Sequence, residues 1–369
     1  MNKTIIFIAQ QLESGGLEKA VITLANELAE RSDYNVKLYI VLHSAPIVPI
    51  SDKICVCFLT SKVLKKEIFI ERYFRKIVEL CAVKKVIRKI NNSVVISSRN
   101  EYSTIISKYT DNSNYVIAQL HNDYSLKERR DFIKKYKKIN VFVQLNETFK
   151  QEIELAIRGK NSFTKIPVIP NFIERRYYEE KSRENYVIAV GGFNKVKGFD
   201  RLIEIWKLVC EKNKEWTLII VGDGKEFMNI KNLVLEKKMT ETVKFTGRLS
   251  NGEVFRYMQK SKIYALSSYS EAFPFVALEA MHTKLPIVAF DVRTGPRNII
   301  RNNETGFLVK DGDLVEFANK LLLLMNNHEL WQVMSTASEL HSENFLKENV
   351  MKKWFGLIDE GFETIRKKN

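Results

Sequence analysis

Short apolar runs alternate with stretches of helical periodicity along most of the chain. In the first half, for example, the run at 4–9 is followed by a helical stretch over 18–31. Strands that are apolar on both faces and separated by helices are typical of a parallel sheet covered by helices on both sides. The first half thus predicts strands at 4–9, 36–41, 54–59, 94–97, 115–120, 141–144 and 166–169, and a further helix at 147–157.

The alternation stops near residue 171 and resumes at 186, and the segment 172–185 has no consistent period, as expected of a linker. The second half predicts strands at 186–190, 216–221, 243–245, 263–267, 286–290 and 306–309, with helices at 200–210, 225–236 and 275–282. A chain of 369 residues suits two domains. We therefore expect two Rossmann-like, doubly wound α/β domains, 1–171 and 186–349, that face a ligand-binding cleft. A helix over about 350–369 is a candidate to pack back on the first domain.

The chain contains no apolar run of membrane-spanning length, and the run at its start is too short for a signal peptide. These features predict a cytoplasmic protein. The four cysteines, Cys55, Cys57, Cys81 and Cys210, lack the spacing of a metal site and are expected to be buried, reduced thiols.

The net charge of +15 comes mainly from two local segments in the first half. Residues 62–92 hold ten basic and three acidic residues, and residues 127–138 hold seven basic and two acidic ones. Both segments predict amphipathic helices because apolar residues recur between the charges. A basic amphipathic surface suits an anionic membrane leaflet. Nucleic acid is the rival partner, and a merely solvated basic face is the third interpretation.

The strongest local motif lies at 268–281, where a predicted strand is followed by a helix start. Pro274 is expected at the first helical position, so that the backbone N–H groups of Phe275 and Val276 form a helix N-terminus. Helix N-termini bind diphosphates well. Glu271 precedes this helix and Glu279 lies within it, so both can bind sugar hydroxyls. Alternatively, Glu271 only caps the helix and Glu279 is solvated.

The string EAFPFVALE at 271–279 resembles the E-x7-E motif of retaining glycosyltransferases of family 4, which have the GT-B fold. Other stretches resemble motifs of that family in the same order along the chain. They are GGLE at 15–18, VGGFNKVKGF at 190–199, VGDG at 221–224, FTGR at 245–248, LPIVAFD at 285–291 and TGFLV at 305–309. The resemblance covers nearly the whole chain and is strongest over 186–310.

The resemblance implies roles for individual residues. Glu271 would contact the donor sugar, Glu279 the ribose hydroxyls, and Lys197 the diphosphate leaving group. A cation about 4 Å from a phosphate contributes about 4 kcal/mol at an effective dielectric constant of about 20. That charge suits a mechanism with no metal ion and no other cofactor. The pair Asp311 and Asp313 is better explained by Asp313 capping the next helix than by a metal site.

Further residues follow from the same resemblance. His121, after a first-domain strand, would contact the donor sugar near the reacting centre, and Gly16 would let the backbone approach a ligand closely. Arg248 belongs to the FTGR match and is counted with the nucleotide-sugar site. The family usually has Arg where this chain has Gly192, so a second diphosphate cation is missing, and Lys195 is a candidate substitute.

The stretch TGPR at 294–297 resembles a motif of bacterial enzymes that use UDP-sugars to assemble polysaccharides or lipid-linked oligosaccharides. We therefore expect a hexosyltransferase that moves a hexose or N-acetylhexosamine from a UDP-sugar to a glycan or lipid-linked acceptor, as in lipopolysaccharide or capsule synthesis. Two alternatives are a basic nucleic-acid-binding protein and a nucleotide-sugar epimerase of the same two-domain shape. The basic helices carry no RNA-binding signature, and E-x7-E is a transferase feature, so neither alternative nor a nucleic-acid partner is favoured.

Overall fold

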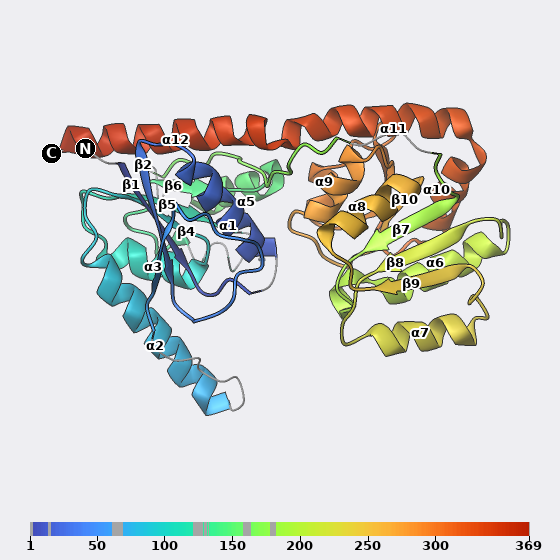
Figure 1. The fold of residues 1–369 in the computed structure, drawn as a ribbon, viewed down its shortest axis with the longest axis horizontal. Helices are drawn as coiled ribbons and strands as arrows, with labels where there is room; N and C mark the ends of the chain where they lie inside the picture. Colours follow the sequence, from blue (N-terminus) through green and yellow to red (C-terminus); the bar gives the residue numbers. More distant parts are fainter. Residues whose placement is uncertain are drawn as a thin grey trace. The chain divides into compact units, whose positions relative to one another are not determined.

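The chain divides into two α/β units in the computed structural model (Figure 1). Unit 1 comprises Met1–Pro170 together with Val350–Asn369, and unit 2 comprises Asn171–Asn349. The structure describes residues 3–13, 16–60, 69–120, 128, 131, 133–157, 164–177 and 182–368.

Unit 1 is built on a six-stranded parallel sheet in the order β3-β2-β1-β4-β5-β6. Val and Ile dominate the central strands, and β4 and β5 are buried along their whole length. The strands are β1 (Lys3–Ala9), β2 (Tyr34–Ile40), β3 (Cys55–Phe58), β4 (Val94–Ser97), β5 (Tyr115–Gln119) and β6 (Val141–Val143). The helices of this half are α1 (Gly16–Ala29), α2 (Phe69–Ile87), α3 (Asn100–Tyr109) and α5 (Glu147–Ile157).

Unit 2 repeats this design with the order β12-β11-β10-β7-β8-β9, again all parallel. Its strands are β7 (Tyr186–Val190), β8 (Thr217–Val221), β9 (Val243–Gly247), β10 (Ile263–Leu266), β11 (Ile287–Asp291) and β12 (Gly306–Lys310). Its helices are α6 (Phe199–Cys210), α7 (Phe227–Glu236), α8 (Asn251–Lys260), α9 (Phe275–His282), α10 (Leu314–Asn326) and α11 (His328–Ser342), with 3-10 turns η1 (Lys195–Lys197), η2 (Gly295–Asn298) and η3 (Glu343–Phe345).

Both sheets have the strand order of a Rossmann-like, doubly wound fold, so the predicted fold class is confirmed. The order reverses between β1 and β4 in unit 1 and between β7 and β10 in unit 2. Loops that leave adjacent strands at such a point run in opposite directions and leave a crevice at the carboxyl ends of the strands. Ligand sites are therefore expected after β1 and β4 in unit 1 and after β7 and β10 in unit 2.

The last helix, α12 (Lys347–Lys368), returns the chain to unit 1. Its Asp359 carboxylate accepts hydrogen bonds from Lys3 Nζ at 2.7 Å, Arg31 Nη1 at 2.9 Å and the Tyr34 hydroxyl at 3.0 Å. Burial, together with the hydrogen bond to Asp359, raises the pKa of Tyr34. These bonds fasten α12 to β1 and β2, beside which it lies in Figure 1.

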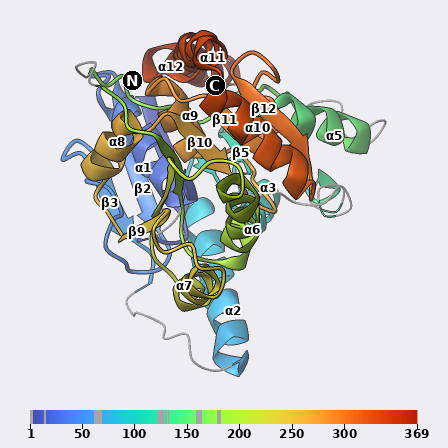
Figure 2. The same ribbon diagram turned by 90° about the vertical axis from the view of Figure 1, so that its right-hand side faces the viewer.

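Helix α2 forms the first of the two basic segments, and its N-terminal part extends beyond the sheet of its own unit (Figures 1 and 2). Of the second basic segment, 127–138, the structure describes residues 128, 131 and 133–138. The helix expected over this segment does not extend through residues 134–138, which form turns and bends. The described residues of the expected linker, 172–177 and 182–185, belong to unit 2, where Ile173 forms a bridge with Leu346.

Two further expectations from the sequence are wrong. Residues 166–169 form no strand but a single isolated bridge, between Val168 and Gln144 directly after β6, because Pro167 and Pro170 have no N–H to donate to a sheet. The cysteines are free but not buried: Cys55 and Cys81 are exposed, and Cys57 and Cys210 are half-buried. Cys55 is exposed because β3 is an edge strand, and Cys81 is exposed because it lies on the outer side of α2.

Candidate functional site

The reversal point of the unit 2 sheet brings two loops together at the carboxyl ends of β7 and β10. The loop after β7 leads through η1 to α6, and the loop after β10 leads to α9. Lys197 lies on the first loop and Glu271 on the second. The topology alone therefore predicts a ligand site at these two residues.

The first loop is shaped by a tight turn at residues 194–198. The Asn194 side chain accepts a hydrogen bond from the Lys197 N–H at 3.2 Å, and Gly198 ends the turn with φ of 62°. A Cβ at position 198 would lie 2.2 Å from the Ser267 carbonyl oxygen, so only glycine fits. The Lys-Gly pair thus lets this turn pack directly against the loop that follows β10.

Lys197 and Glu271 form an ion pair within this site. Lys197 Nζ lies 2.6 Å from Glu271 Oε1, and the Ser268 hydroxyl donates to the same oxygen at 2.7 Å. The side chain of Glu271 is 10% exposed and that of Lys197 is 27% exposed. An ammonium group has three hydrogens, so Lys197 can also donate to an anionic ligand on its open side.

The backbone of Glu271 is fixed by the loop after β11. The Thr294 hydroxyl donates to the Glu271 carbonyl at 2.6 Å. A Cβ at Gly295 would lie 2.6 Å from Glu271 Cβ, so this position also needs glycine. The Thr-Gly stretch that the sequence linked to UDP-sugar enzymes therefore holds Glu271 in place.

Helix α9 begins at Phe275, followed by Val276, and Pro274 is its N-cap residue. The helix thus spans the predicted residues 275–282, but Pro274 is its N-cap and not its first helical residue as expected, and Glu271 does not cap the helix. A proline side chain cannot accept a hydrogen bond, and the first N–H that bonds back to Pro274 is that of Ala277, at 3.1 Å. The N-terminus of α9 is therefore not capped by the side chain of its N-cap residue.

Glu279 lies half-buried on α9. It shares an electrostatic environment with Glu271, because both carboxylates act on the buried Tyr264 of β10. Burial raises the pKa of Tyr264 first, and the charges of Glu271 and Glu279 raise it further. Both glutamates of the motif thus lie near the Tyr264 side chain.

Arg201 of α6 holds the loop between β10 and α9. Its guanidinium donates to the carbonyl oxygens of Ser267 and Ser268, and its Nη1 lies 2.7 Å from Asp311 Oδ1. The residue is 6% exposed and lies between the Tyr269 and Phe290 rings, 4.0 and 3.9 Å from their centroids. Sequence reasoning did not single out Arg201, Ser268 or Thr294. The only signal was their position beside the Lys-Gly, E-x7-E and TGPR motifs.

Of the other predicted residues of unit 2, Gly192 and Lys195 lie on the same loop as Lys197, and Arg248 lies on another loop. Lys195 opens η1 and is exposed, and Gly192 is exposed just after β7. A Cβ at Gly192 would meet only ordinary contacts, the nearest at 3.6 Å from Asn194 Nδ2, so a side chain fits there. Arg248 is exposed directly after β9, two strands from β7. No described contact joins these three residues to Lys197 or Glu271.

The two predicted site residues of unit 1 are placed only in part. Gly16 is exposed and is the first residue of α1, which follows β1 at the reversal point of the unit 1 sheet. His121 lies outside the described residues.

Asp313 caps α10, as predicted, because its carboxylate accepts the Glu316 N–H at 2.9 Å. Asp311 is paired with Arg201 instead of pointing with Asp313 at a common centre. Among the described residues, no group of three or more His, Cys, Asp or Glu side chains is arranged to hold a metal ion.

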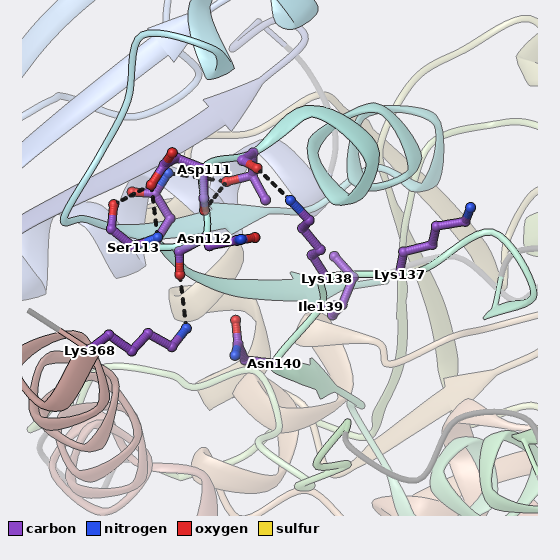
Figure 3. A pocket seen from close by; sticks show the side chains of 10 residues that line it. Asp111, Asn112, Ser113, Lys137, Lys138, Ile139, Asn140 and Lys368 are labelled. Carbon is purple, nitrogen blue, oxygen red and sulfur yellow. Dashed lines mark hydrogen bonds between the residues drawn. The ribbon is translucent and has the colours of Figure 1, made fainter.

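A cavity of about 490 Å³ lies elsewhere, at the amino ends of β5 and β6 in unit 1. Figure 3 shows Lys138 and Lys368 at its wall, each donating to a backbone carbonyl, of Thr110 at 3.2 Å and Asn112 at 2.9 Å. The Asp111 carboxylate accepts from Ser113. These contacts lie at the amino ends of the strands. The cavity is therefore separate from the motif residues, which follow the carboxyl ends of strands.

Residues 171–341 match the family model of "Glycosyl transferases group 1". An uncharacterized glycosyltransferase of Haemophilus influenzae is 29% identical over 97% of this chain and 100% of its own length. The amylovoran biosynthesis glycosyltransferase AmsD of Erwinia amylovora is 26% identical over 97% and 100%. Staphylococcus aureus TarM, solved with Fondaparinux, alpha-GlcNAc-glycerol and UDP, superposes with a TM-score of 0.77 at 16% identity, over 96% of this chain and 99% of TarM.

These similarities confirm the coarser predictions. The two Rossmann-like units have the GT-B fold, and residues 171–341 are a group 1 glycosyltransferase domain. Lys197, Glu271 and Glu279 all lie within that domain.

Proposed function

We propose that this glycosyltransferase moves a hexose or N-acetylhexosamine from a UDP-sugar, with retention of configuration, to a glycan or lipid-linked acceptor in bacterial surface-polysaccharide synthesis. The observation that carries the proposal is the contact of Lys197 with Glu271 at the reversal point of the unit 2 sheet. One cation and one nearly buried carboxylate there suit a charged diphosphate joined to a sugar. The family 4 resemblance of the sequence agrees with this assignment.

Each group has a distinct task in this proposal. Lys197 stabilises the negative charge that develops on the diphosphate as the sugar leaves, and the N-terminus of α9, at Phe275 and Val276, binds the phosphates through its dipole. Glu271 accepts hydrogen bonds from hydroxyls of the donor sugar, and Glu279 from the ribose. His121, Gly16, Gly192, Lys195 and Arg248 keep the supporting roles that the resemblance gives them.

The donor and the acceptor class are supported by relatives of known role. TarM was solved with UDP, and the Erwinia amylovora relative is named for amylovoran biosynthesis. Charge neutralisation by Lys197 makes the proposed reaction independent of a metal ion. No helix among the residues that the structure describes is both long and apolar enough to cross a bilayer. We propose that the enzyme works in the cytoplasm, as a peripheral protein on the inner face of the cell membrane.

A panel of nucleotide sugars tests the proposal. UDP-, GDP- and ADP-sugars are each scored by calorimetric binding and by slow hydrolysis of the donor. We expect UDP-sugars to bind at least tenfold more tightly than the others, with unchanged activity in EDTA. Preference for GDP- or ADP-sugars would refute the donor assignment. Activity that EDTA abolishes and manganese restores would refute the metal-free mechanism.

A further inference from the structure

Helix α2 presents an apolar stripe on its outer side. Phe74 is 62% exposed, Ile77 is 41% exposed and Val78 is 44% exposed, and Cys81 is exposed as well. Residues at i, i+3, i+4 and i+7 lie on one face of a helix, so these four side chains form one continuous stripe. Large apolar residues scattered singly on a surface need no explanation, but a stripe on one helix face does.

The opposite face of α2 is fixed to unit 1. Val83 and Ile87 are fully buried. The Glu79 carboxylate is also buried and accepts hydrogen bonds from the Tyr102 hydroxyl at 2.9 Å and from Gln10 Nε2 at 2.8 Å. Rotating α2 to hide its apolar stripe would break these contacts. The stripe is therefore held outward by the packing of the other face.

Basic residues follow the stripe in the last turn of α2 and in the turn directly after it, at 88–89. Residues 74–89 hold six basic residues and one acidic residue, the buried Glu79. Lys85, Arg88 and Lys89 are exposed. Lys84 and Arg88 lie over the Tyr109 ring, 4.5 and 4.8 Å from its centroid. The helix thus combines exposed apolar side chains with a high local positive charge.

We propose that the outer face of α2 docks on an anionic lipid bilayer, with Phe74, Ile77 and Val78 in the acyl boundary and the basic residues on lipid phosphates. An apolar stripe flanked by Lys and Arg is the pattern of helices that lie in a membrane interface. Single-stranded nucleic acid would favour several exposed aromatic rings for base stacking, whereas two of the three most exposed apolar residues of this stripe are aliphatic.

The position of α2 suits a lipid-linked acceptor, and this part of the inference rests on the proposed function. Gln10, which holds Glu79, directly follows β1 at the carboxyl end of the unit 1 sheet. Gly16, a candidate acceptor-side residue, lies on the same loop region at the start of α1. Docking through α2 would thus bring the membrane to the edge of unit 1 that carries this loop.

Vesicle flotation tests the proposal with the full chain. Vesicles of phosphatidylcholine alone are compared with vesicles that also contain phosphatidylglycerol, at low and high salt. We expect binding to the anionic vesicles only, weakened by salt because exposed charges are screened over about 10 Å. The variant Phe74→Ser/Ile77→Ser should reduce binding at least tenfold. Lys85→Glu/Lys89→Glu should reduce it by about fivefold or more for each residue.

Matched controls distinguish docking through α2 from nonspecific adsorption to vesicles. Val333 and Leu340 of α11 are 62% and 66% exposed, and their double change to Ser removes similar apolar surface from a helix whose charged residues include Glu329 and Glu339. The variant Lys352→Glu/Lys367→Glu reverses two exposed charges on α12, outside both basic segments. Both controls should float more strongly than the corresponding α2 variants, and all variants should unfold at the wild-type temperature.

Three outcomes would overturn the inference: no flotation of the wild type with anionic vesicles at low salt, equal flotation of Phe74→Ser/Ile77→Ser, or tight binding to single-stranded RNA without vesicle binding. UDP affinity is measured on the same samples. If the wild type floats but binds no nucleotide sugar, the proposed function fails while membrane docking stands.

Discussion

Replacing Arg201 with Met tests whether this buried guanidinium holds the loop that carries Glu271. Met keeps an unbranched apolar chain between Tyr269 and Phe290 but removes every donor. The carbonyl oxygens of Ser267 and Ser268 then lose a charged partner. The Asp311 carboxylate is half exposed, so its pair with Arg201 adds at most about 1 kcal/mol. Each hydrogen bond to a charged group contributes about 1.5–3 kcal/mol, so losing the two bonds to these carbonyls costs about 3–6 kcal/mol.

Thermal unfolding and donor kinetics measure this effect. For a domain of this size, 1 kcal/mol corresponds to about 2–4 °C, so the transition of unit 2 should fall by roughly 6–24 °C. Asp311→Asn is the control and should shift it by only a few degrees. If the loop positions Glu271, kcat should fall in folded Arg201→Met at low temperature, and Arg201→Lys should rescue it partly, because an ammonium cannot match the planar fork. Stability and kcat equal to wild type would refute the reasoning.

Four further changes have definite expected outcomes. Glu279→Ala should raise the Kd for UDP by roughly 10- to 150-fold, because hydrogen bonds to a charged group contribute about 1.5–3 kcal/mol; calorimetry showing an unchanged Kd would contradict the ribose assignment. Lys197→Ala should lower kcat by roughly 10²–10³-fold in steady-state assays, and an unchanged kcat would exclude Lys197 as the leaving-group cation. Gly192→Arg has room for its side chain and should tighten UDP binding by several-fold in calorimetry if a second cation is missing; no change would leave position 192 without a role. Burial lowers the pKa of His282, whose Nε2 accepts the Arg176 N–H at 3.0 Å. The folded chain therefore holds His282 neutral, and thermal stability should fall as pH drops below about 6.5; His282→Gln should flatten that dependence, and a slope identical to wild type would refute the link.

The fold was predictable because its signals are local. The buried β4 and β5 consist mainly of apolar residues, and helical periods separate the strands, so the parallel sheets follow from the pattern. The errors have local causes too. Pro167 and Pro170 interrupt an apolar run that reads as a strand, and Pro274 fits either the N-cap or the first helical turn. The exposure of Cys55 depended on β3 being an edge strand, which the sequence order does not reveal.

The chemistry of the site was predictable only where a motif carried it. Lys197 and Glu271 are 74 residues apart and meet because the strand order reverses between β7 and β10. Arg201 and Thr294 donate to backbone carbonyl oxygens of the loop after β10. Every residue has such a carbonyl, so no residue type in the sequence marks these partners. Their roles therefore emerge only from the three-dimensional arrangement. The apolar stripe of α2 could be predicted only in part, since the sequence showed the amphipathic pattern of the helix but not which of its sides would be covered.

The ion pair of Lys197 with Glu271 changes how the site should be understood. A nearly buried carboxylate without a partner is costly, so Lys197 and Ser268 stabilise Glu271 before any ligand binds. Under the proposed function, a diphosphate at Lys197 shares the ammonium group with Glu271 and weakens their pair, while sugar hydroxyls add hydrogen bonds to Glu271. On that proposal both halves of the donor are needed, since free diphosphate would leave Glu271 undercompensated. Loss of activity in Lys197→Ala alone would therefore combine two effects, and only comparison with Glu271→Gln and the double variant separates leaving-group stabilisation from the support of Glu271.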